Sequence, residues 1–399
     1  MKKVAILSLD PRNGGGILHS LQQLYVFCEQ EDFAPTVFFV NFDPAVSAGV
    51  KNFTLKSKIV ELELFGMRCV GIGSRWAFWE PGHYQFTLTD WAKALEGFDY
   101  FWVSSGTAIA GHPLVLLGKK FVAWLATPLL GDREGKRAGS PVRALAWLFA
   151  RPKMLSIEAE VLARANYLLP MSMYAKIAFE KLARHKIAKV QICGYPMPNL
   201  LSVAVTPAKT SLDCISIGRF TDPRKDVATL LSAWQIVATQ KPEAVLHLVG
   251  ETPAAVILKK FANLFALGSV VVHEKVSQAE KYALLNQSDV AIISSLQEGL
   301  CIAGLEAASV GLPIVATDCG GPSDYVIESI TGFVVAVGDV KTMAAKILKL
   351  LTNVTLRQKM GAQGKALVKH FFDAQRIFKI FRTAMQEVWP ELAVKSKQL

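Results

Sequence analysis

Short apolar runs alternate with longer amphipathic patterns through nearly the whole chain, and this alternation restricts the fold more than any other feature. It is typical of parallel sheets whose strands are joined by crossover helices. In the first half we expect strands at residues 4–9, 36–40, 68–72, 100–103, 121–125, 167–170 and 190–193. In the second half we expect them at residues 214–217, 245–249, 270–273, 290–293, 314–316 and 333–335. The sequence therefore predicts the α/β class, with two doubly wound, Rossmann-like domains in series.

A chain of 399 residues is long enough for two domains. Residues 194–199 contain Pro196 and Pro198, which end regular structure, and a weakly patterned stretch follows as far as Thr210. We place the boundary there, with the first domain at residues 1–195 and the second at residues 196–373. The last helical pattern lies within residues 374–399, and we expect it to pack back on the first domain.

Apolar runs and cysteines exclude several classes of protein. The apolar runs fall short of the roughly 20 residues that a bilayer helix needs, and the first residues suit a buried strand better than a signal peptide. Six cysteines show no C-x-x-C spacing, so neither a disulfide framework nor a zinc site is expected. We therefore expect a cytoplasmic protein.

Positive charge is concentrated in one segment of the chain. Residues 119–189 hold fourteen Lys and Arg against five Asp and Glu, while the whole chain carries a net charge of +11. Some of these cations flank residues 144–150, which include Trp147 and Phe149. Such a mixture suits an anionic membrane surface, and a solvated helix face is an equally good explanation. Nucleic acid is not expected as a partner, because no motif for binding it accompanies the charge.

The most informative stretch begins where the strand at 290–293 ends. A loop then carries Glu298 and Gly299, and a helix is predicted to begin near Ile302. Backbone N–H groups of Leu300, Cys301 and Ile302 would point outward at the helix start, which suits a diphosphate. Glu298 and Glu306 would flank that phosphate position, one reaching a sugar and the other a ribose. Taken alone, two surface carboxylates that favour a helix start explain this pattern better.

The flanking residues change that balance. Residues 298–317 read E-G-L-C-I-A-G-L-E-A-A-S-V-G-L-P-I-V-A-T and are followed by G-G-P at 320–322. This block resembles the donor site of glycosyltransferase family 4. Residues 218–225 match the family's G-R-x5-K segment, with L-L-S-A-W following at 230–234, and residues 246–250 match its L-H-L-V-G strand. The resemblance covers most of the second half and implies a retaining, nucleotide-sugar-dependent enzyme of the GT-B fold.

The resemblance also implies roles for individual residues. Arg219 and Lys225 would neutralise the donor diphosphate, Glu298 would hold the sugar hydroxyls, and Glu306 the ribose hydroxyls. The rest of the implied donor site is Gly218, Gly250, Gly299, Leu300, Cys301 and Ile302. No Asp-x-Asp occurs in the sequence, so we expect no metal and no other cofactor beyond the nucleotide sugar.

In the first half, Gly14, Gly15 and Gly16 follow a predicted strand and precede a helix at residues 17–29. The resemblance implies contact with the donor sugar phosphate or the acceptor, and a plain tight turn is the alternative. The family usually has a histidine at the end of a first-domain strand, but the strand at 121–125 is followed by A-T-P. His112 is the nearest candidate to replace it, although a histidine in such a position more commonly has a structural role at a helix start or in the core.

The predicted reaction is glycosyl transfer with retention in a cleft between the two domains. The leaving phosphate would take the acceptor proton, so no protein nucleophile is required. We expect a glycan, lipid-linked or other cell-envelope acceptor, met in the cytoplasm or peripherally at the inner face of the membrane. A catalytically degenerate protein that binds nucleotide sugars or acts as a scaffold is the first alternative. An epimerase or phosphorylase of the same fold is the second, although no cofactor-lysine motif of a phosphorylase is present.

Overall fold

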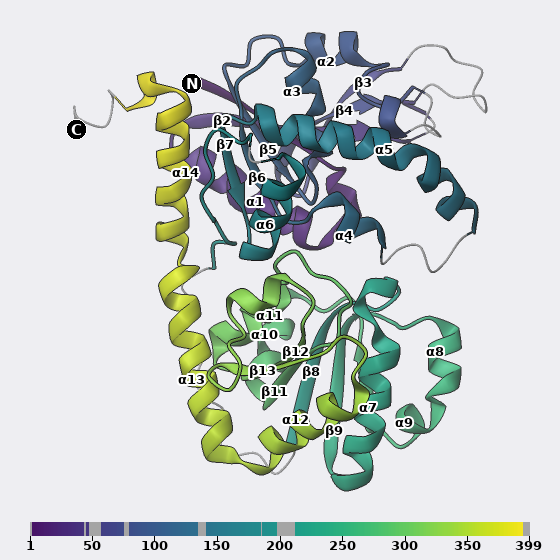
Figure 1. Ribbon diagram of the computed structural model, residues 1–399. Helices are drawn as coiled ribbons and strands as arrows, with labels where there is room; N and C mark the ends of the chain where they lie inside the picture. Colours follow the sequence, from purple (N-terminus) through teal and green to yellow (C-terminus); the bar gives the residue numbers. More distant parts are fainter. Residues whose placement is uncertain are drawn as a thin grey trace. The chain divides into compact units, whose positions relative to one another are not determined.

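The structure is a computed structural model that describes residues 2–43, 45–47, 57–75, 80–134, 141–184, 186–197 and 212–393. The chain divides into two compact units, each with its own sheet and core (Figure 1). The first unit comprises Met1–Asp132, Ser140–Tyr195 and Ile377–Leu399, and the second comprises Arg133–Gly139 and Pro196–Arg376.

A seven-stranded sheet in the order β3-β4-β2-β1-β5-β6-β7 forms the centre of the first unit. Its strands are β1 (Lys2–Ser8), β2 (Phe33–Asn41), β3 (Ile59–Leu64), β4 (Met67–Gly73), β5 (Tyr100–Ser105), β6 (Val122–Leu125) and β7 (Tyr167–Pro170). All neighbours pair in parallel except the edge pair β3 and β4.

Two expectations for this sheet were wrong. Strand β3 was not predicted, because its sequence I-V-E-L-E-L alternates on a half-exposed edge instead of forming a buried apolar run. Residues 190–193 were predicted as a strand, but within the described chain Val190 makes one isolated bridge, to Leu168. The Gln191 and Cys193 N–H groups donate to the carbonyls of Leu168 and Pro170 in β7, at 3.0 and 2.9 Å, but the segment does not form a regular strand.

The first unit's helices are α1 (Gly15–Gln30), α2 (Leu88–Ala94), α3 (His112–Leu116), α4 (Leu129–Glu134), α5 (Pro141–Arg164) and α6 (Met173–Leu182), with short 3-10 turns η1 (Pro11–Asn13), η3 (Glu80–Gly82) and η4 (Ala108–Gly111). Most of α14 (Ala374–Val388), followed by η8 (Pro390–Leu392), also belongs to this unit. The Phe381 ring of α14 is fully buried and meets Phe27, Trp102 and Trp124 edge-on. These aromatic contacts join the last helix to the first sheet.

The second unit holds a six-stranded parallel sheet in the order β10-β9-β8-β11-β12-β13. Its strands are β8 (Leu212–Arg219), β9 (Ala244–Glu251), β10 (Val270–His273), β11 (Val290–Ile293), β12 (Ile314–Thr317) and β13 (Gly332–Val335). Each strand predicted for the second half is present, and the predicted α/β class with two doubly wound sheets is confirmed.

Helices cover both faces of the second sheet (Figure 1). They are α7 (Val227–Gln240), α8 (Ala255–Lys260), α9 (Ala262–Ala266), α10 (Gln278–Gln287), α11 (Ile302–Val310), α12 (Val340–Thr352) and α13 (Val354–Phe371), with η6 (Pro223–Lys225) and η7 (Gly321–Asp324). In the parts of the chain that are described, no helix has the length and apolar character needed to cross a bilayer.

Candidate functional site

Three loops of the second unit meet at the carboxyl ends of its central strands. The loop after β11 is tied to η6 by the Leu296 N–H, which donates to the Arg224 carbonyl at 2.7 Å. It is tied to the loop after β12 by the Glu298 N–H, which donates to the Cys319 carbonyl at 2.7 Å. The Gly321 N–H donates back to the Glu298 carbonyl at 3.0 Å. Hydrogen bonds at both the N–H and the carbonyl of Glu298 therefore fix the backbone position from which its side chain extends.

Lys225 and Glu298 form an ion pair in this loop cluster. The Lys225 Nζ lies 2.6 Å from the Glu298 Oε1, and the Ser295 hydroxyl donates to the same oxygen at 2.7 Å. The two charged side chains are 22% and 15% exposed. Burial by itself would lower the pKa of Lys225, but the adjacent carboxylate outweighs it and holds that pKa above its ordinary value. Lys225 is therefore a charged, largely buried lysine.

Two glycines make room for this lysine. A Cβ atom on Gly218 would lie 3.1 Å from the Lys225 Cε, so the lysine stem runs directly over the backbone at the end of β8. Gly250 faces Gly218 across the β8–β9 pair and has a φ of +132°, and a Cβ there would lie 2.1 Å from the Gly218 carbonyl oxygen. Neither position admits a side chain without a shift of backbone or lysine, which gives both predicted glycines a physical reason.

Arg219, at the last position of β8, is more open. Its side chain is 45% exposed, and its Nη2 lies 3.6 Å from the Asp222 carboxylate. The Arg224 Nη2 lies closer to the same carboxylate, at 2.7 Å. Burial would raise the pKa of Asp222, but the hydrogen bonds and charge of Arg224 outweigh it and lower that pKa below its ordinary value. Arg224 therefore supports η6, while Arg219 keeps an accessible guanidinium at the sheet edge.

Helix α11 begins at Ile302, as predicted, and Cys301 precedes it in the left-handed conformation with φ 64°. Its first backbone N–H groups have no partners within the helix, and the positive end of the helix dipole lies there. Leu300 and Cys301 are 3% and 9% exposed. Burial raises the pKa of the Cys301 thiol to about 12, so the group stays protonated and is no nucleophile at neutral pH. Its carbonyl accepts a hydrogen bond from the Tyr325 hydroxyl at 2.9 Å, which anchors the start of the helix.

The second predicted carboxylate, Glu306, has a lysine partner of its own. Its Oε1 lies 2.5 Å from the Nζ of Lys281 on α10, and these side chains are 9% and 11% exposed. Sequence reasoning missed Lys281, because a single lysine within a helical pattern carries no signal that it is buried. The structure thus gives each predicted carboxylate a separate cation, Lys225 for Glu298 and Lys281 for Glu306.

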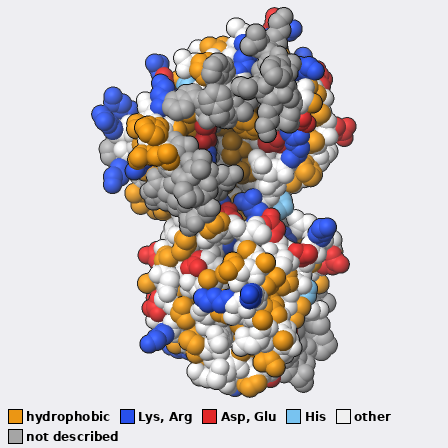
Figure 2. Space-filling model, turned by 90° about the vertical axis from the view of Figure 1, so that its right-hand side faces the viewer, with side chains coloured by type: hydrophobic (Ala, Val, Ile, Leu, Met, Phe, Trp, Pro, Cys, Tyr) orange, Lys and Arg blue, Asp and Glu red, His pale blue; other side chains and the backbone are white. Residues whose placement is uncertain are grey.

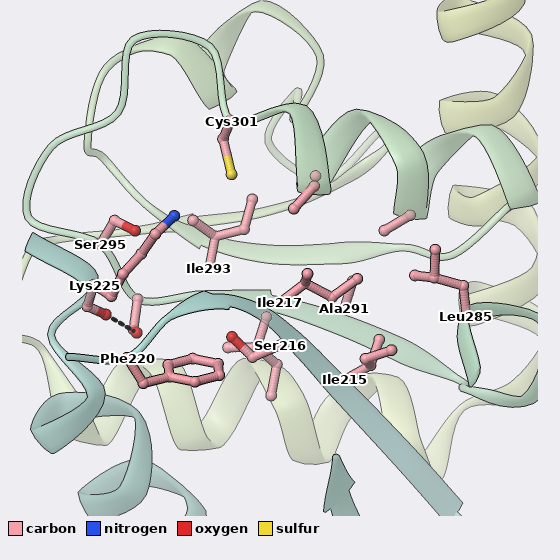
Figure 3. A pocket seen from close by; sticks show the side chains of 15 residues that line it. Ile215, Ser216, Ile217, Phe220, Lys225, Leu285, Ala291, Ile293, Ser295 and Cys301 are labelled. Carbon is pink, nitrogen blue, oxygen red and sulfur yellow. Dashed lines mark hydrogen bonds between the residues drawn. The ribbon is translucent and has the colours of Figure 1, made fainter. Parts of the chain in front are cut away.

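A small cavity lies between α11 and the ends of β8 and β11. Figure 3 shows Lys225 and Cys301 reaching it from different loops, above a floor that includes Ile217, Phe220 and Ile293. Its volume of about 20 Å³ is close to the space that one water molecule needs. It cannot hold a sugar or a nucleotide, so a ligand would have to meet Lys225 and the start of α11 from outside this cavity.

The predicted residues of the first unit lie at the starts of helices α1 and α3. Helix α1 begins at Gly15, and Gly14 and Gly15 have φ values of 64° and 65°, so their backbone takes a conformation that other residues rarely adopt. Gly16 lies in the first turn of α1. His112 is 4% exposed and meets the Tyr84 ring edge-on, with 6.2 Å between ring centroids. Burial lowers the pKa of His112, and its environment matches that of a core histidine.

The basic segment of the sequence is partly described. Arg137 and the side chain of Arg143 lie outside the described residues. Trp147, expected at a membrane surface, is 7% exposed and belongs to the core of the first unit, whereas Phe149 is 69% exposed. Within the described chain, no group of three or more His, Cys, Asp or Glu side chains is arranged to hold a metal ion.

The family described as Glycosyl transferases group 1 matches residues 203–367, which cover the loops and carboxylates above. This match lies in the second unit and confirms the predicted resemblance to GT-B glycosyltransferases over these residues, while assignment to family 4 stays a prediction.

Similar proteins agree with this domain. The capsular polysaccharide biosynthesis glycosyltransferase CapM of Staphylococcus aureus is 27% identical over 157 residues, 39% of this chain and 41% of that protein. The chain thus matches about two fifths of the length of its first curated relatives, at 41% and 42%.

Two solved structures share the fold over nearly the whole chain. Sucrose-phosphate synthase from Thermosynechococcus elongatus superimposes with a TM-score of 0.77 at 17% identity, covering 98% of this chain and 100% of that one. Anabaena HepE, in complex with UDP and glucose, gives a TM-score of 0.70 at 16% identity, covering 97% and 100%. At such low identities the likeness shows the fold alone, which consists of two Rossmann-like domains.

Proposed function

We propose that this protein is a glycosyltransferase that moves a sugar from a nucleoside diphosphate sugar to a glycan, lipid-linked or other cell-envelope acceptor. The observation that carries the proposal is the Lys225–Glu298 pair beside the start of α11, inside the group 1 domain. A buried cation, a carboxylate and a helix N-terminus together provide complementary partners for a diphosphate and a sugar hydroxyl.

In the proposed reaction, Arg219 and Lys225 neutralise the diphosphate as it gains negative charge during departure. Glu298 accepts hydrogen bonds from the sugar, and Glu306 accepts them from the ribose with the oxygen that Lys281 does not hold. The leaving phosphate takes the acceptor proton, which permits attack on the face from which it departs and so retention. Protein cations supply the charge neutralisation, so the proposal requires no metal.

We also propose that Gly14 to Gly16 and His112 contact the donor phosphate or the acceptor. The relatives support the acceptor class in their names alone, since CapM is named for capsular polysaccharide biosynthesis. We further propose that the protein works at the inner face of the cell membrane, because residues 119–189 carry nine more cationic than anionic side chains, fourteen against five. A binding or scaffold protein with the same donor site is the second candidate, favoured by the absence of the family's first-domain histidine.

The decisive experiment is a panel of nucleotide sugars read by thermal shift, followed by transfer assays with the sugars that bind. A ligand at 100 times its dissociation constant adds about 2.7 kcal/mol to folding stability, which is easily measured. Stabilisation by at least one nucleotide sugar, with transfer to an acceptor, is expected. Stabilisation without hydrolysis or transfer would favour the scaffold candidate, and no stabilisation by any donor would refute both.

A further inference from the structure

The first turns of α5 present three large apolar side chains to solvent. Leu145, Leu148 and Phe149 are 59%, 61% and 69% exposed. Their spacing of three and four residues places them on one face of the helix. Trp147 and Ala150, at 7% and 8% exposure, point to the opposite side and join the core of the first unit. The described side chains of these turns are therefore apolar on both faces, and those of one face are exposed.

This apolar exposure is confined to the helix start. Pro152 lies inside α5, where it cannot donate to the Leu148 carbonyl, and a proline at such a position kinks a helix. Figure 1 shows the first turns of α5 set at an angle to the rest of the helix. Beyond the proline the outward positions become polar, with exposed Lys153, Ser156 and Glu160. The exposed apolar face thus belongs to a separate, angled tip of the helix.

Two cationic residues, Arg151 and Lys153, follow this tip along the helix. Lys153 is exposed and lies four residues after Phe149 on the same face, and Arg151 is partly exposed. The sequence from residue 141 to residue 157 contains no acidic residue. Figure 2 shows hydrophobic side chains beside Lys and Arg on the side of the first unit that carries this tip. Large apolar groups bordered by cations are the composition of helices that lie in the interface of an anionic bilayer.

Size decides between a bilayer and a protein partner. Three partly exposed side chains offer roughly a few hundred Å² of apolar surface, whereas a stable protein interface buries about 800 Å² on each partner. A bilayer does not need that area, because each nearby Lys or Arg adds its own attraction to anionic headgroups. The small apolar face with basic neighbours therefore fits lipid better than a second copy of the chain.

We infer that Leu145, Leu148 and Phe149 insert into the headgroup region of an anionic membrane, so that α5 is the anchor of this protein. This inference rests on the proposed function in one respect, because such an anchor would hold the protein near a membrane-borne acceptor. The proposed function requires only that the basic segment adsorb to the membrane, and salt would reverse such adsorption completely. Insertion of an apolar helix face is a further step, because salt does not screen apolar contacts.

The test uses the full-length protein and sedimentation with phosphatidylcholine vesicles, with and without 30 mol% (about one third) phosphatidylglycerol. The variant Leu145→Ser, Leu148→Ser, Phe149→Ser removes the apolar face. We expect it to partition about 100-fold more weakly, which equals about 2.8 kcal/mol at 1.4 kcal/mol per factor of ten. The matched control is Val256→Ser, Leu267→Ser, two side chains of the second unit that are 72% and 80% exposed. The control should bind vesicles like the unchanged protein.

Three results would overturn the inference. They are equal partitioning of the unchanged protein and the triple variant, equal binding to neutral and anionic vesicles, and a dimer that the triple variant dissociates without any change in vesicle binding. Calorimetry with UDP, GDP and ADP separates this inference from the proposed function. Loss of vesicle binding with intact nucleotide affinity supports the anchor, whereas an unchanged protein that binds vesicles but no nucleotide would refute the donor site alone.

Discussion

Replacing Lys225 by methionine removes the ammonium group beside Glu298 and keeps an unbranched stem to pack over Gly218. Breaking a buried ion pair costs about 3–5 kcal/mol, because the remaining charge is left without a partner. The 22% and 15% exposure of the two side chains lets water reach them, so we expect the lower end, about 3 kcal/mol. For a domain of this size that corresponds to a fall of about 6–12 °C in the melting temperature of the second unit.

The charge itself is tested by a double-mutant cycle with Glu298→Gln. The double variant leaves no lone buried charge, so its loss of stability should be smaller than the sum of the two single losses by about 1–2 kcal/mol. Lys241→Met is the matched control, since Lys241 pairs with Glu243 at 3.7 Å with side chains 33% and 50% exposed. An exposed pair of this kind contributes at most about 1 kcal/mol. Melting curves and urea titrations give all four values.

Binding provides the functional half of this prediction. A hydrogen bond to a charged group contributes about 1.5–3 kcal/mol, so Lys225→Met should weaken nucleoside diphosphate binding about tenfold to a hundredfold. Glu298→Gln should keep most of that affinity and lose sugar transfer, because its proposed partner is the sugar. The reasoning is refuted if Lys225→Met melts like the unchanged protein, if the double variant is additive, or if diphosphate affinity in calorimetry does not change.

Burial raises the pKa of Glu158 from 4.5 to about 7, so the folded protein keeps a proton that the unfolded chain releases above pH 4.5. Stability should therefore fall by about 3 kcal/mol as the pH rises through this window, relative to Glu158→Gln, and parallel pH–melting curves for the two proteins would contradict this. A Cβ on Gly304 would lie 2.2 Å from the Tyr325 hydroxyl oxygen, so Gly304→Ala should cost about 1–3 kcal/mol in a denaturant titration and weaken diphosphate binding by displacing the start of α11. Lys281→Met leaves Glu306 buried and unpaired, and should lower the unfolding free energy of the second unit by about 3–5 kcal/mol. Lys281→Arg should recover part of that loss, and an unchanged melting temperature in Lys281→Met would show that the pair contributes nothing.

Much of the centre of the second unit was predictable because strands β11 and β12 are fully buried. A parallel strand covered on both faces is a continuous apolar run, as in V-A-I-I of β11, and such runs are visible without any knowledge of their neighbours. The start of α11 at Ile302 was predictable for a related reason, since a glycine-bearing loop precedes a short apolar helix. Strand β3 escaped prediction because an edge strand pairs on one side and needs no such run.

Burial of charged and aromatic side chains was not predictable. Trp147 and Phe149 are two positions apart in one helix, yet one lies in the core and the other faces solvent. Their sequence context is the same apolar stretch, so local pattern could not assign them to opposite faces. Lys225 illustrates the same limit, because a lysine in a loop is ordinarily exposed, and its burial follows from the absence of a side chain on Gly218.

The sequence by itself predicted most of the strands, in their order, and the motif that the group 1 match covers. These are local properties, since periodicity and glycine placement act over a few neighbouring residues. The tertiary structure decided which charges meet. Lys225 reaches Glu298 across 73 positions, because parallel strands bring the segments after their carboxyl ends to one edge of the sheet. Lys281 reaches Glu306 across 25 positions, because helices α10 and α11 contact each other. Pairing at that distance depends on packing of the whole unit, which no stretch of the sequence specifies alone.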